Sequence, residues 1–446
     1  MNSINKSDNL IKILDSNDNS FGEQLELLLA FDPQHNKLLF EKVESIINKI
    51  KIKGDDALLE YSSKFDNYSV SSVTELEVSK KSLQDAYSSI SFAERSALNT
   101  AADRIYKYHE NQELKSYSYL DEYGSQISMR VLPIEKVGIY VPGGTAAYPS
   151  SVLMNAIPAR VANVKEIVMV VPSPGGILNP MVLAAAHLAG VSKVFKLGGA
   201  HAIAALAFGT KIVPKVDKIV GPGNSYVAEA KKQVFGMVGI DMVAGPSEIL
   251  VVCDGKTNPD WVALDLFSQA EHDESAQAIL VSTDRNFISK VHSSMQNLLP
   301  KMDRKSVIAK SLKDRGALIY VDNLTEACSL ANRIAPEHLE LSVENSQSWS
   351  KLITNAGSLF LGRYSSESLG DYCAGPNHVL PTSGSARFSS GLSVYDFKKR
   401  ISVIAVSEEG ADVLGRVAST LANGEKLSAH ALAAEYRMKN HFSSKV

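Results

Sequence analysis

The chain has 446 residues, 45% of them hydrophobic, and a formal net charge of -3 at neutral pH. This length suggests roughly two or three domains, and the composition is that of a globular protein rather than a disordered one. The charge balance offers no broad basic face, which argues against nucleic acid as a partner. No apolar run reaches the ~18 residues of a membrane helix, and residues 1–19 lack the pattern of a secretory signal. We therefore expect a cytoplasmic protein with no membrane partner.

The cysteines limit the chemistry of any metal site. Cys253, Cys328 and Cys373 form no CxxC pair, and their number is odd. A disulfide framework is therefore not expected. If the protein binds a metal, its ligands must be mainly nitrogen and oxygen atoms.

The first third of the chain is predicted to be largely helical. Residues 1–30 are a polar lead into a short helix, and apolar residues at three- and four-residue spacing predict helices over 38–65 and 79–112. Residues 126–141 then have the character of strands.

From residue 137 to residue 235, short apolar strands alternate with helices, and the same rhythm restarts after residue 246 and continues to residue 361. This alternation is typical of βαβ units and predicts two α/β units with mostly parallel sheets. Residues 393–446 are predicted to form a mostly helical tail without strands.

Glycine-rich turns recur beside the predicted strands. They comprise residues 142–144, 172–176, 198–199, 221–224 and 245–247. Turns at the carboxyl ends of parallel strands are where ligands bind, and glycine lets a ligand approach the backbone closely. None has the GxGxxG pattern, and any one of them is explained by turn geometry alone. Several within one unit favour a phosphate or dinucleotide cleft.

A few side chains could hold a metal ion. Gln269 and His272 are three residues apart near the end of a predicted helix that begins at Asn258-Pro259, so they share one face. His378 follows Asp371 in a turn-rich segment, and His430 lies in the tail. Such nitrogen and oxygen ligands suit Zn²⁺. For each residue taken alone, a solvated polar surface is the better explanation.

Glu337 and His338 form a candidate acid–base pair. They follow Pro336 at the end of a predicted helix and have apolar neighbours in the sequence. A carboxylate and an imidazole held in apolar surroundings can have pKa values useful near neutral pH. A surface pair at the start of a strand explains the sequence equally well.

Taken together, these motifs resemble the histidinol dehydrogenase family. The resemblance runs from about residue 20 to about residue 440 and rests on short segments that occur in one order. They are residues 137–144, 218–224, 244–248, 268–273, 336–339, 370–371, 377–382 and 427–430.

The resemblance implies a role for each matching residue. The implied zinc ligands are Gln269, His272, Asp371 and His430, and the implied catalytic pair is Glu337 and His338. The implied substrate-binding residues are Ser247, Gln269, His272, His338, Asp371, His378, Glu425 and His430. The implied cofactor-binding residues are Tyr140, His201 and Asn224. His201 stands where the family usually has glutamine, which puts that cofactor contact in doubt.

The family's fold implies two incomplete Rossmann-like domains with N-terminal helices and a helical C-terminal tail. Residues 31–139 and 247–392 would form the domain with the metal and catalytic residues, after an N-terminal segment 1–30. Residues 140–246 would form the NAD-binding domain. Residues 393–446 would be a tail that contributes to the partner's active site in a homodimer.

The implied activity is the oxidation of L-histidinol to L-histidine through bound L-histidinaldehyde, with two NAD and one Zn²⁺ per subunit. A relative of the same fold that oxidises another small amino alcohol or polyol is the alternative. A zinc hydrolase is disfavoured by the absence of HExxH. A dimer with purely structural zinc is disfavoured because such sites are usually rich in cysteine.

Overall fold

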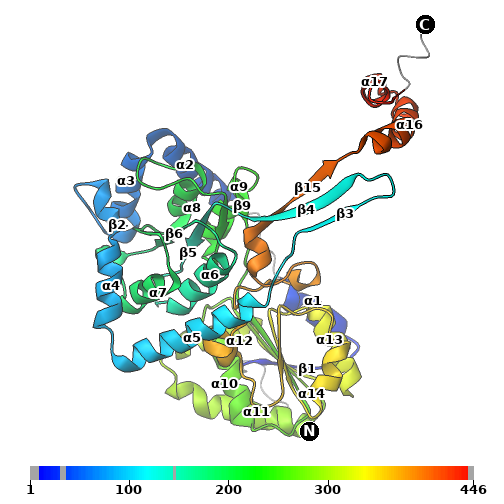
Figure 1. The fold of residues 1–446 in the computed structure, drawn as a ribbon. Helices are drawn as coiled ribbons and strands as arrows, with labels where there is room; N and C mark the ends of the chain where they lie inside the picture. The colour runs from blue at the N-terminus through cyan, green and yellow to red at the C-terminus, as the bar shows by residue number, and fades with distance from the viewer. Residues whose placement is uncertain (1–9, 31–36, 144–146, 440–446) are drawn as a thin grey trace. The chain divides into compact units, whose positions relative to one another are not determined.

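The computed structural model describes residues 10–30, 37–143 and 147–439. It divides into two compact units, the first formed by Met1–Asn111 with Glu135–Asp396 and the second by Gln112–Ile134 with Phe397–Val446 (Figure 1). Parts of the expected N-terminal segment, first domain, first glycine turn and tail lie outside the described residues. These parts are 1–9, 31–36, 144 and 440–446.

The first unit contains a fully parallel six-stranded sheet, here called sheet A. Its strands, in spatial order, are β1 (Lys12–Asp15), β12 (Ala317–Tyr320), β11 (Gln277–Ser282), β10 (Glu248–Cys253), β13 (His338–Ser342) and β14 (Ser358–Leu361). The chain runs outward from β10 through β11 to β12 and then returns to place β13 on the other side of β10. The strand order therefore reverses between β10 and β13.

Helices cover both faces of sheet A because its strands are apolar on both sides. Ile249 and Val251 pack toward α10 (Pro259–Ala270), α11 (Arg285–Leu298) and α12 (Lys305–Arg315). Leu250 and Val252 pack toward α1 (Phe21–Leu29) and α13 (Leu324–Ile334). The result is a three-layer α/β/α arrangement.

Sheet B is the second six-stranded sheet of the first unit. Its order is β2 (Glu77–Val78), β7 (Lys193–Lys196), β6 (Glu166–Val171), β5 (Lys136–Tyr140), β8 (Lys218–Val220) and β9 (Gly239–Ile240). All neighbours are parallel except β2 with β7. The strand order reverses between β5 and β8.

Sheet B is also enclosed by helices. One core gathers α2 (Lys37–Lys53), α3 (Asp55–Asp66), α8 (Gly199–Phe208) and α9 (Ser225–Val234). On the other side, α6 (Pro149–Val161) and α7 (Pro180–Ala189) pack together, with α4 (Lys80–Ser89) and α5 (Phe92–Glu110) against them. The predicted fold class, two α/β units with mostly parallel sheets and N-terminal helices, is confirmed.

The predicted N-terminal helices are interrupted at identifiable residues. Gly54, with φ +53°, separates α2 from α3, a conformation that glycine adopts at low cost. Ser91 separates α4 from α5 and caps α5 with a capping box that includes Glu94. The strand β1 within residues 1–30 was not predicted, because four residues at a sheet edge carry too little periodicity.

The second unit corrects the prediction of a strand-free tail. Here β15 (Lys398–Ala405) pairs antiparallel with β4 (Gln126–Pro133), which pairs in turn with β3 (Tyr117–Leu120). Among its described residues, the tail forms the α-helices α16 (Glu408–Gly424) and α17 (Ser428–Glu435), and a short 3₁₀ helix at Val394–Phe397 precedes the strand. The strand was missed because its residues are largely exposed on both faces, so no alternation of apolar and polar residues marks it.

The N-terminal elements divide between the sheets differently from the expected domain boundaries. β1 pairs in sheet A, whereas α2 packs against α8 and α9, and β2 pairs with β7 of sheet B. Local periodicity predicts a helix but does not say which sheet it covers. Cys253 and Cys328 are buried, Cys373 is half-buried, and all three are unpaired. Among the described helices, none combines the length and apolarity that crossing a bilayer requires.

Candidate active site

Glu337 and His338 lie at the amino end of β13, beside the point where the strand order of sheet A reverses. The helix α13 ends at Ile334, Ala335 adopts a left-handed conformation with φ +52°, and β13 begins at His338. The two residues are 6% and 3% exposed. The alternative of a surface pair is therefore wrong.

The two side chains face different partners. Oε2 of Glu337 accepts a hydrogen bond from the backbone N–H of Glu248, the first residue of β10, at 2.8 Å. Nδ1 of His338 lies 3.1 Å from the backbone carbonyl oxygen of the same residue. Because a carbonyl can only accept, Nδ1 carries the hydrogen, and in the neutral form of the ring Nε2 keeps its lone pair. Nε2 lies 3.3 Å from Oδ1 of Asp371, but neither atom has a well-directed hydrogen bond among the described residues.

Gln269 reaches the same centre from the last turn of α10. Asn258 caps this helix and Pro259 is its first residue, as predicted. With its amide nitrogen turned toward Glu367, Gln269 donates to Oε1 of Glu367 at 2.5 Å and to the carbonyl oxygen of Glu248 at 3.1 Å. Gln269 is 1% exposed, so it does not belong to a solvated helix end.

His272 lies just beyond the end of α10 rather than within the helix as predicted, although its N–H still bonds to the carbonyl oxygen of Gln269 at 3.2 Å. The residue is exposed. Loss of water around its ring lowers the pKa of His272, and the nearby Asp371 carboxylate opposes that shift. His272 is thus close to Asp371 and also open on one side.

Asp371 and His378 lie on either side of an irregular backbone segment. Asp371 is in a single π-helical turn, Gly370–Ala374, a feature that is frequent at functional sites. Nδ1 of His378 lies 3.1 Å from the carbonyl oxygen of Asp371. A pocket of about 320 Å³ is lined by His338, Asp371 and His378 together with apolar side chains such as Phe360. It is large enough for a small amino alcohol.

The pKa values of Glu337 and His338, the candidate acid–base pair, depart from those in water. Burial raises the pKa of Glu337 to about 8, and the charge of His338 opposes this. Burial alone would lower the pKa of His338, but the carboxylates of Glu367, Glu337 and Asp371 outweigh it and hold the pKa well above its usual range. Glu337 and His338 therefore gain and lose protons at pH values well above those at which exposed glutamate and histidine side chains do so.

The donor atoms at this centre suit a divalent metal ion. Ligand atoms of His338, Glu367 and Asp371 lie within 4.8 Å of one another. The buried Nε2 of His338 and Oδ1 of Asp371 lack well-directed hydrogen bonds among the described residues, and no cysteine takes part. A nitrogen and oxygen donor set of this kind fits Zn²⁺.

Glu367 was missed by the sequence analysis. Its carboxylate is 2% exposed, accepts from Oγ of Ser268 at 3.1 Å and lies 3.5 Å from Nδ1 of His338. Its backbone N–H donates to Glu340, another buried carboxylate, at 2.7 Å. The only local signal was its position four residues before Asp371, which is not informative without the fold.

The remaining residues that were expected to bind substrate or metal are Ser247, Glu425 and His430. Ser247 is half-buried and directly precedes Glu248 at the start of β10. Glu425 and His430 belong to the second unit, where both are exposed. Their proposed roles stay predictions.

Three expected cofactor residues lie around the carboxyl ends of the sheet B strands, where glycine turns follow β5, β6, β7 and β8 as predicted. The fifth turn, 245–247, instead precedes β10 of sheet A. The hydroxyl oxygen of Tyr140 accepts from the N–H of Gly199 at 3.1 Å, and burial raises the pKa of Tyr140 to about 12. Asn224 is exposed and caps α9.

His201 behaves differently from a residue poised to bind a ligand at the surface. It is 1% exposed and its ring packs against the rings of Tyr61 and Phe65. Burial lowers the pKa of His201 to about 3, so the ring is neutral. Neither ring nitrogen has a hydrogen-bond partner among the described residues. The contact of His201 with a cofactor stays a prediction.

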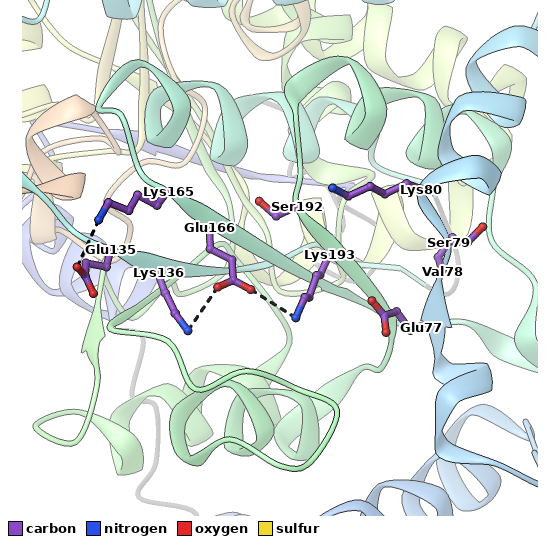
Figure 2. A pocket seen from close by; sticks show the side chains of 10 residues that line it. All are labelled: Glu77, Val78, Ser79, Lys80, Glu135, Lys136, Lys165, Glu166, Ser192 and Lys193. Carbon is purple, nitrogen blue, oxygen red and sulfur yellow. Dashed lines mark ion pairs between the residues drawn. The ribbon is translucent and has the colours of Figure 1, made fainter.

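A larger hollow of about 560 Å³ lies at the opposite, amino-terminal edge of sheet B (Figure 2). Its charged side chains neutralise one another: Glu166 pairs with Lys136 at 3.4 Å and Lys193 at 3.5 Å. These groups are partly or fully exposed. The hollow is therefore a weaker candidate for a catalytic site than the buried centre around His338, because its charged groups are paired and open to solvent.

The comparisons with known proteins agree with this geometry. The family model described as histidinol dehydrogenase matches residues 32–438. A histidinol dehydrogenase of Dechloromonas aromatica is 58% identical over 430 residues, which cover 96% of this chain and 99% of the relative. One of Pseudomonas fluorescens is 57% identical over 430 residues, covering 96% and 98%. The crystal structure of histidinol dehydrogenase from Elizabethkingia anophelis superimposes with a TM-score of 0.88 at 37% identity, covering 96% of this chain and 98% of that one. The chain belongs to the histidinol dehydrogenase family.

Proposed function

We propose that the protein oxidises L-histidinol to L-histidine through bound L-histidinaldehyde, with two NAD⁺ and one Zn²⁺ per subunit. Family membership over nearly the whole chain supports the activity. The observation that carries the mechanism is the buried centre in which Glu337, His338, Gln269 and Asp371 converge. In this proposal, sheet A and the segments that follow its strands supply the catalytic and metal residues of the first unit, and sheet B with its glycine turns binds NAD.

The metal would be held by Gln269, His272, Asp371 and His430. Of the three clustered donors, only Asp371 belongs to this set, which leaves Nε2 of His338 free as a base and Glu367 as the partner of Gln269. When bound, it would supply a positive charge that holds the imidazole and amine of the substrate in place, which is the orienting role of a metal. The amide of Gln269 is already oriented for this role, because its nitrogen is taken up by Glu367 and the carbonyl of Glu248. The amide oxygen is the atom left for a cation.

His338 is the proposed base of the first oxidation. Its Nδ1–H is committed to the carbonyl of Glu248, so Nε2 takes the proton of the substrate hydroxyl. The C–H bond of the same carbon breaks as a hydride leaves for NAD⁺, giving the aldehyde, NADH and one proton. A cation near Asp371 would offset the carboxylate charge that now raises the pKa of His338, and so would favour the neutral imidazole.

Glu337 is the proposed base of the second oxidation. It is held by the N–H of Glu248, and burial raises its pKa to about 8. Its deprotonated carboxylate is therefore a stronger base than an exposed one and can take a proton from water with His338 beside it. The water oxygen adds to the aldehyde carbon, and a second hydride leaves for a second NAD⁺. The products are the carboxylate, NADH and two protons. Retaining the aldehyde in the pocket keeps a reactive species from bulk solvent.

The substrate would occupy the pocket that contains His338, Asp371 and His378. Ser247 and His378 are proposed to contact it directly, and Glu425 to pair with its cationic amine or imidazole. NAD⁺ is proposed to lie at the carboxyl edge of sheet B, near Tyr140 and Asn224, because ligands bind where the strand order of an open α/β sheet reverses. His201 is proposed to contribute to the same cofactor site, with an NAD affinity altered by the imidazole that stands where the family usually has glutamine.

We further propose a homodimer with shared active sites. The second unit exposes many large apolar side chains for its size, more than a solvated surface needs. They include Tyr117, Tyr119 and Leu120 of β3, Ile401 and Ile404 of β15, and Val417, Leu421 and Leu432 of the tail helices. A second copy of this chain is the proposed cover, and it would bring Glu425 and His430 to the partner's pocket. A cytoplasmic location and the absence of nucleic-acid partners complete the proposal.

The substrate is tested by NADH formation from zinc-loaded protein with L-histidinol, compared with amino alcohols that lack the imidazole. We expect turnover with L-histidinol and at least about a hundredfold lower kcat/KM without the imidazole, since buried polar partners would be left unpaired. Preference for an amino alcohol without the imidazole would favour the alternative, a relative of the same fold with another substrate.

A further inference from the structure

A buried ion pair lies behind the turn that follows β8. Nζ of Lys231, on α9, lies 2.5 Å from Oδ1 of Asp241, and the two side chains are 2% and 0% exposed. The mechanism proposed above uses neither residue. Their burial therefore requires a separate explanation.

The pair binds both polar backbone groups of one glycine. Nζ of Lys231 donates to the carbonyl oxygen of Gly221 at 2.9 Å. The N–H of Gly221 donates to Oδ2 of Asp241 at 2.8 Å. Gly221, Lys231 and Asp241 thus form a closed ring of three interactions in which every charged group has a partner.

Lys231 and Asp241 together hold both polar backbone groups of Gly221, and we call this pair the clamp. Gly221 also lies directly against the neighbouring strand β5. Gly221 has φ +109°, and a Cβ at this position would lie 2.1 Å from the carbonyl oxygen of Tyr140. Only glycine can therefore occupy the position. The clamp and this close approach together fix the start of turn 221–224 against the end of β5.

Stability alone does not explain the pair. Removing two charges from water carries a large free-energy penalty, and proteins with apolar replacements of similar volume are often no less stable. The buried pair is better explained by conformational specificity, because it holds the backbone in one of the conformations that the turn could adopt. What it fixes is the turn that carries Asn224, between the ends of β5 and β8 where the order of sheet B reverses.

We infer that Lys231 and Asp241 are positioning residues that hold turn 221–224 in the conformation that binds the cofactor. The inference rests on the proposed NAD site at this edge of sheet B. Because the clamp acts on the backbone of the turn, its loss should weaken the binding of NAD and leave the catalytic centre on sheet A intact.

The test compares Lys231→Met with Lys232→Met, its neighbour on α9. Lys232 is 45% exposed and pairs only loosely with Glu229, at 3.9 Å. Binding of NAD⁺ alone is measured by calorimetry, together with zinc content and the steady-state constants for both substrates. We expect Lys231→Met to raise Kd and KM for NAD about tenfold or more, since small misplacements of binding groups are costly. Zinc content and KM for L-histidinol should not change, and Lys232→Met should match the wild type.

Lys231→Met leaves Asp241 buried without its partner and can fail to fold. The double variant Lys231→Met with Asp241→Asn removes both charges, keeps similar shapes and should fold, with the same loss of NAD affinity. Wild-type NAD affinity in a folded double variant would overturn the inference, as would equal losses for NAD and L-histidinol. A wild-type protein that binds NAD⁺ but does not oxidise L-histidinol would refute the proposed function and leave this test valid.

Discussion

At the scale of single residues, two adjacent positions in the chain are proposed to have different roles because their side chains face different groups. Glu337 is fixed by an N–H donor and His338 by a carbonyl acceptor, both from Glu248. The donor stabilises the carboxylate, and the acceptor keeps the hydrogen on Nδ1 of the imidazole. The proposed roles of the two residues rest on this difference.

The division of labour predicts different defects for two substitutions. His338→Asn should lower both oxidations by about 10² to 10⁴-fold, the usual effect of losing a general base. Glu337→Gln should lower the oxidation of L-histidinaldehyde by a similar factor and that of L-histidinol much less. Single-turnover measurements with each substrate separate the two steps. Equal losses in both steps for Glu337→Gln would contradict the assignment.

Asp66 gives a prediction about stability and pH. This residue of α3 is 7% exposed, and burial raises its pKa from 3.8 to about 6. Between these values the folded protein holds a proton that the unfolded chain releases, so stability falls as pH rises and the full penalty applies above about pH 6. Asp66→Asn should therefore stabilise the protein by about 2 kcal/mol near pH 8.

The same substitution should have little effect near pH 4, where the carboxyl is protonated in the folded state. Urea unfolding at both pH values measures the difference. A gain of equal size at the two pH values would show that the charge of Asp66 is not the cause.

At the scale of elements, α10 brings Gln269 to the site and depends on its cap. The side chain of Asn258 accepts the N–H of Asp260, two residues on. Asn258→Ala should cost about 1 kcal/mol and weaken zinc retention, because the helix that carries the proposed ligand Gln269 begins there. Asn258→Ser keeps a capping oxygen and should behave as the wild type. Thermal unfolding with metal analysis tests both, and equal behaviour of the two variants would exclude a role for the cap.

The elements also show what the sequence could predict. The β10–α10 unit was predictable from its apolar strand and its Asn-Pro helix start, both of which are local signals. The strand β15 was not, because its partner β4 is about 270 residues away in the chain and its exposed residues do not alternate. Glu367 was missed for a similar reason: its contacts with Ser268 and Gln269 cross about a hundred residues of chain.

At the scale of the whole molecule, the proposed active site is divided between two compact units. The first holds Glu337, His338 and Asp371, and the second holds Glu425 and His430. The family resemblance placed these residues in one site, whereas spacing along the chain could not. A shared site in a homodimer joins them if each tail serves the other subunit.

Mixing two inactive variants tests this sharing. His338→Asn damages the first unit and His430→Ala the second. Refolding them together should restore about a quarter of the wild-type sites, because half of the dimers are mixed and each mixed dimer has one undamaged site when the tail acts across the interface. No recovery in confirmed mixed dimers would show that His430 serves its own subunit.

The central claim is a four-electron oxidation of L-histidinol that depends on a metal. The most direct measurement is the ratio of NADH formed to L-histidinol consumed, with excess NAD⁺, before and after treatment with a chelator. Two NADH per L-histidinol, with L-histidine as product and activity that is lost with the metal and returns with Zn²⁺, is the result predicted. One NADH per substrate with free aldehyde released, or full activity in metal-free protein, would contradict it.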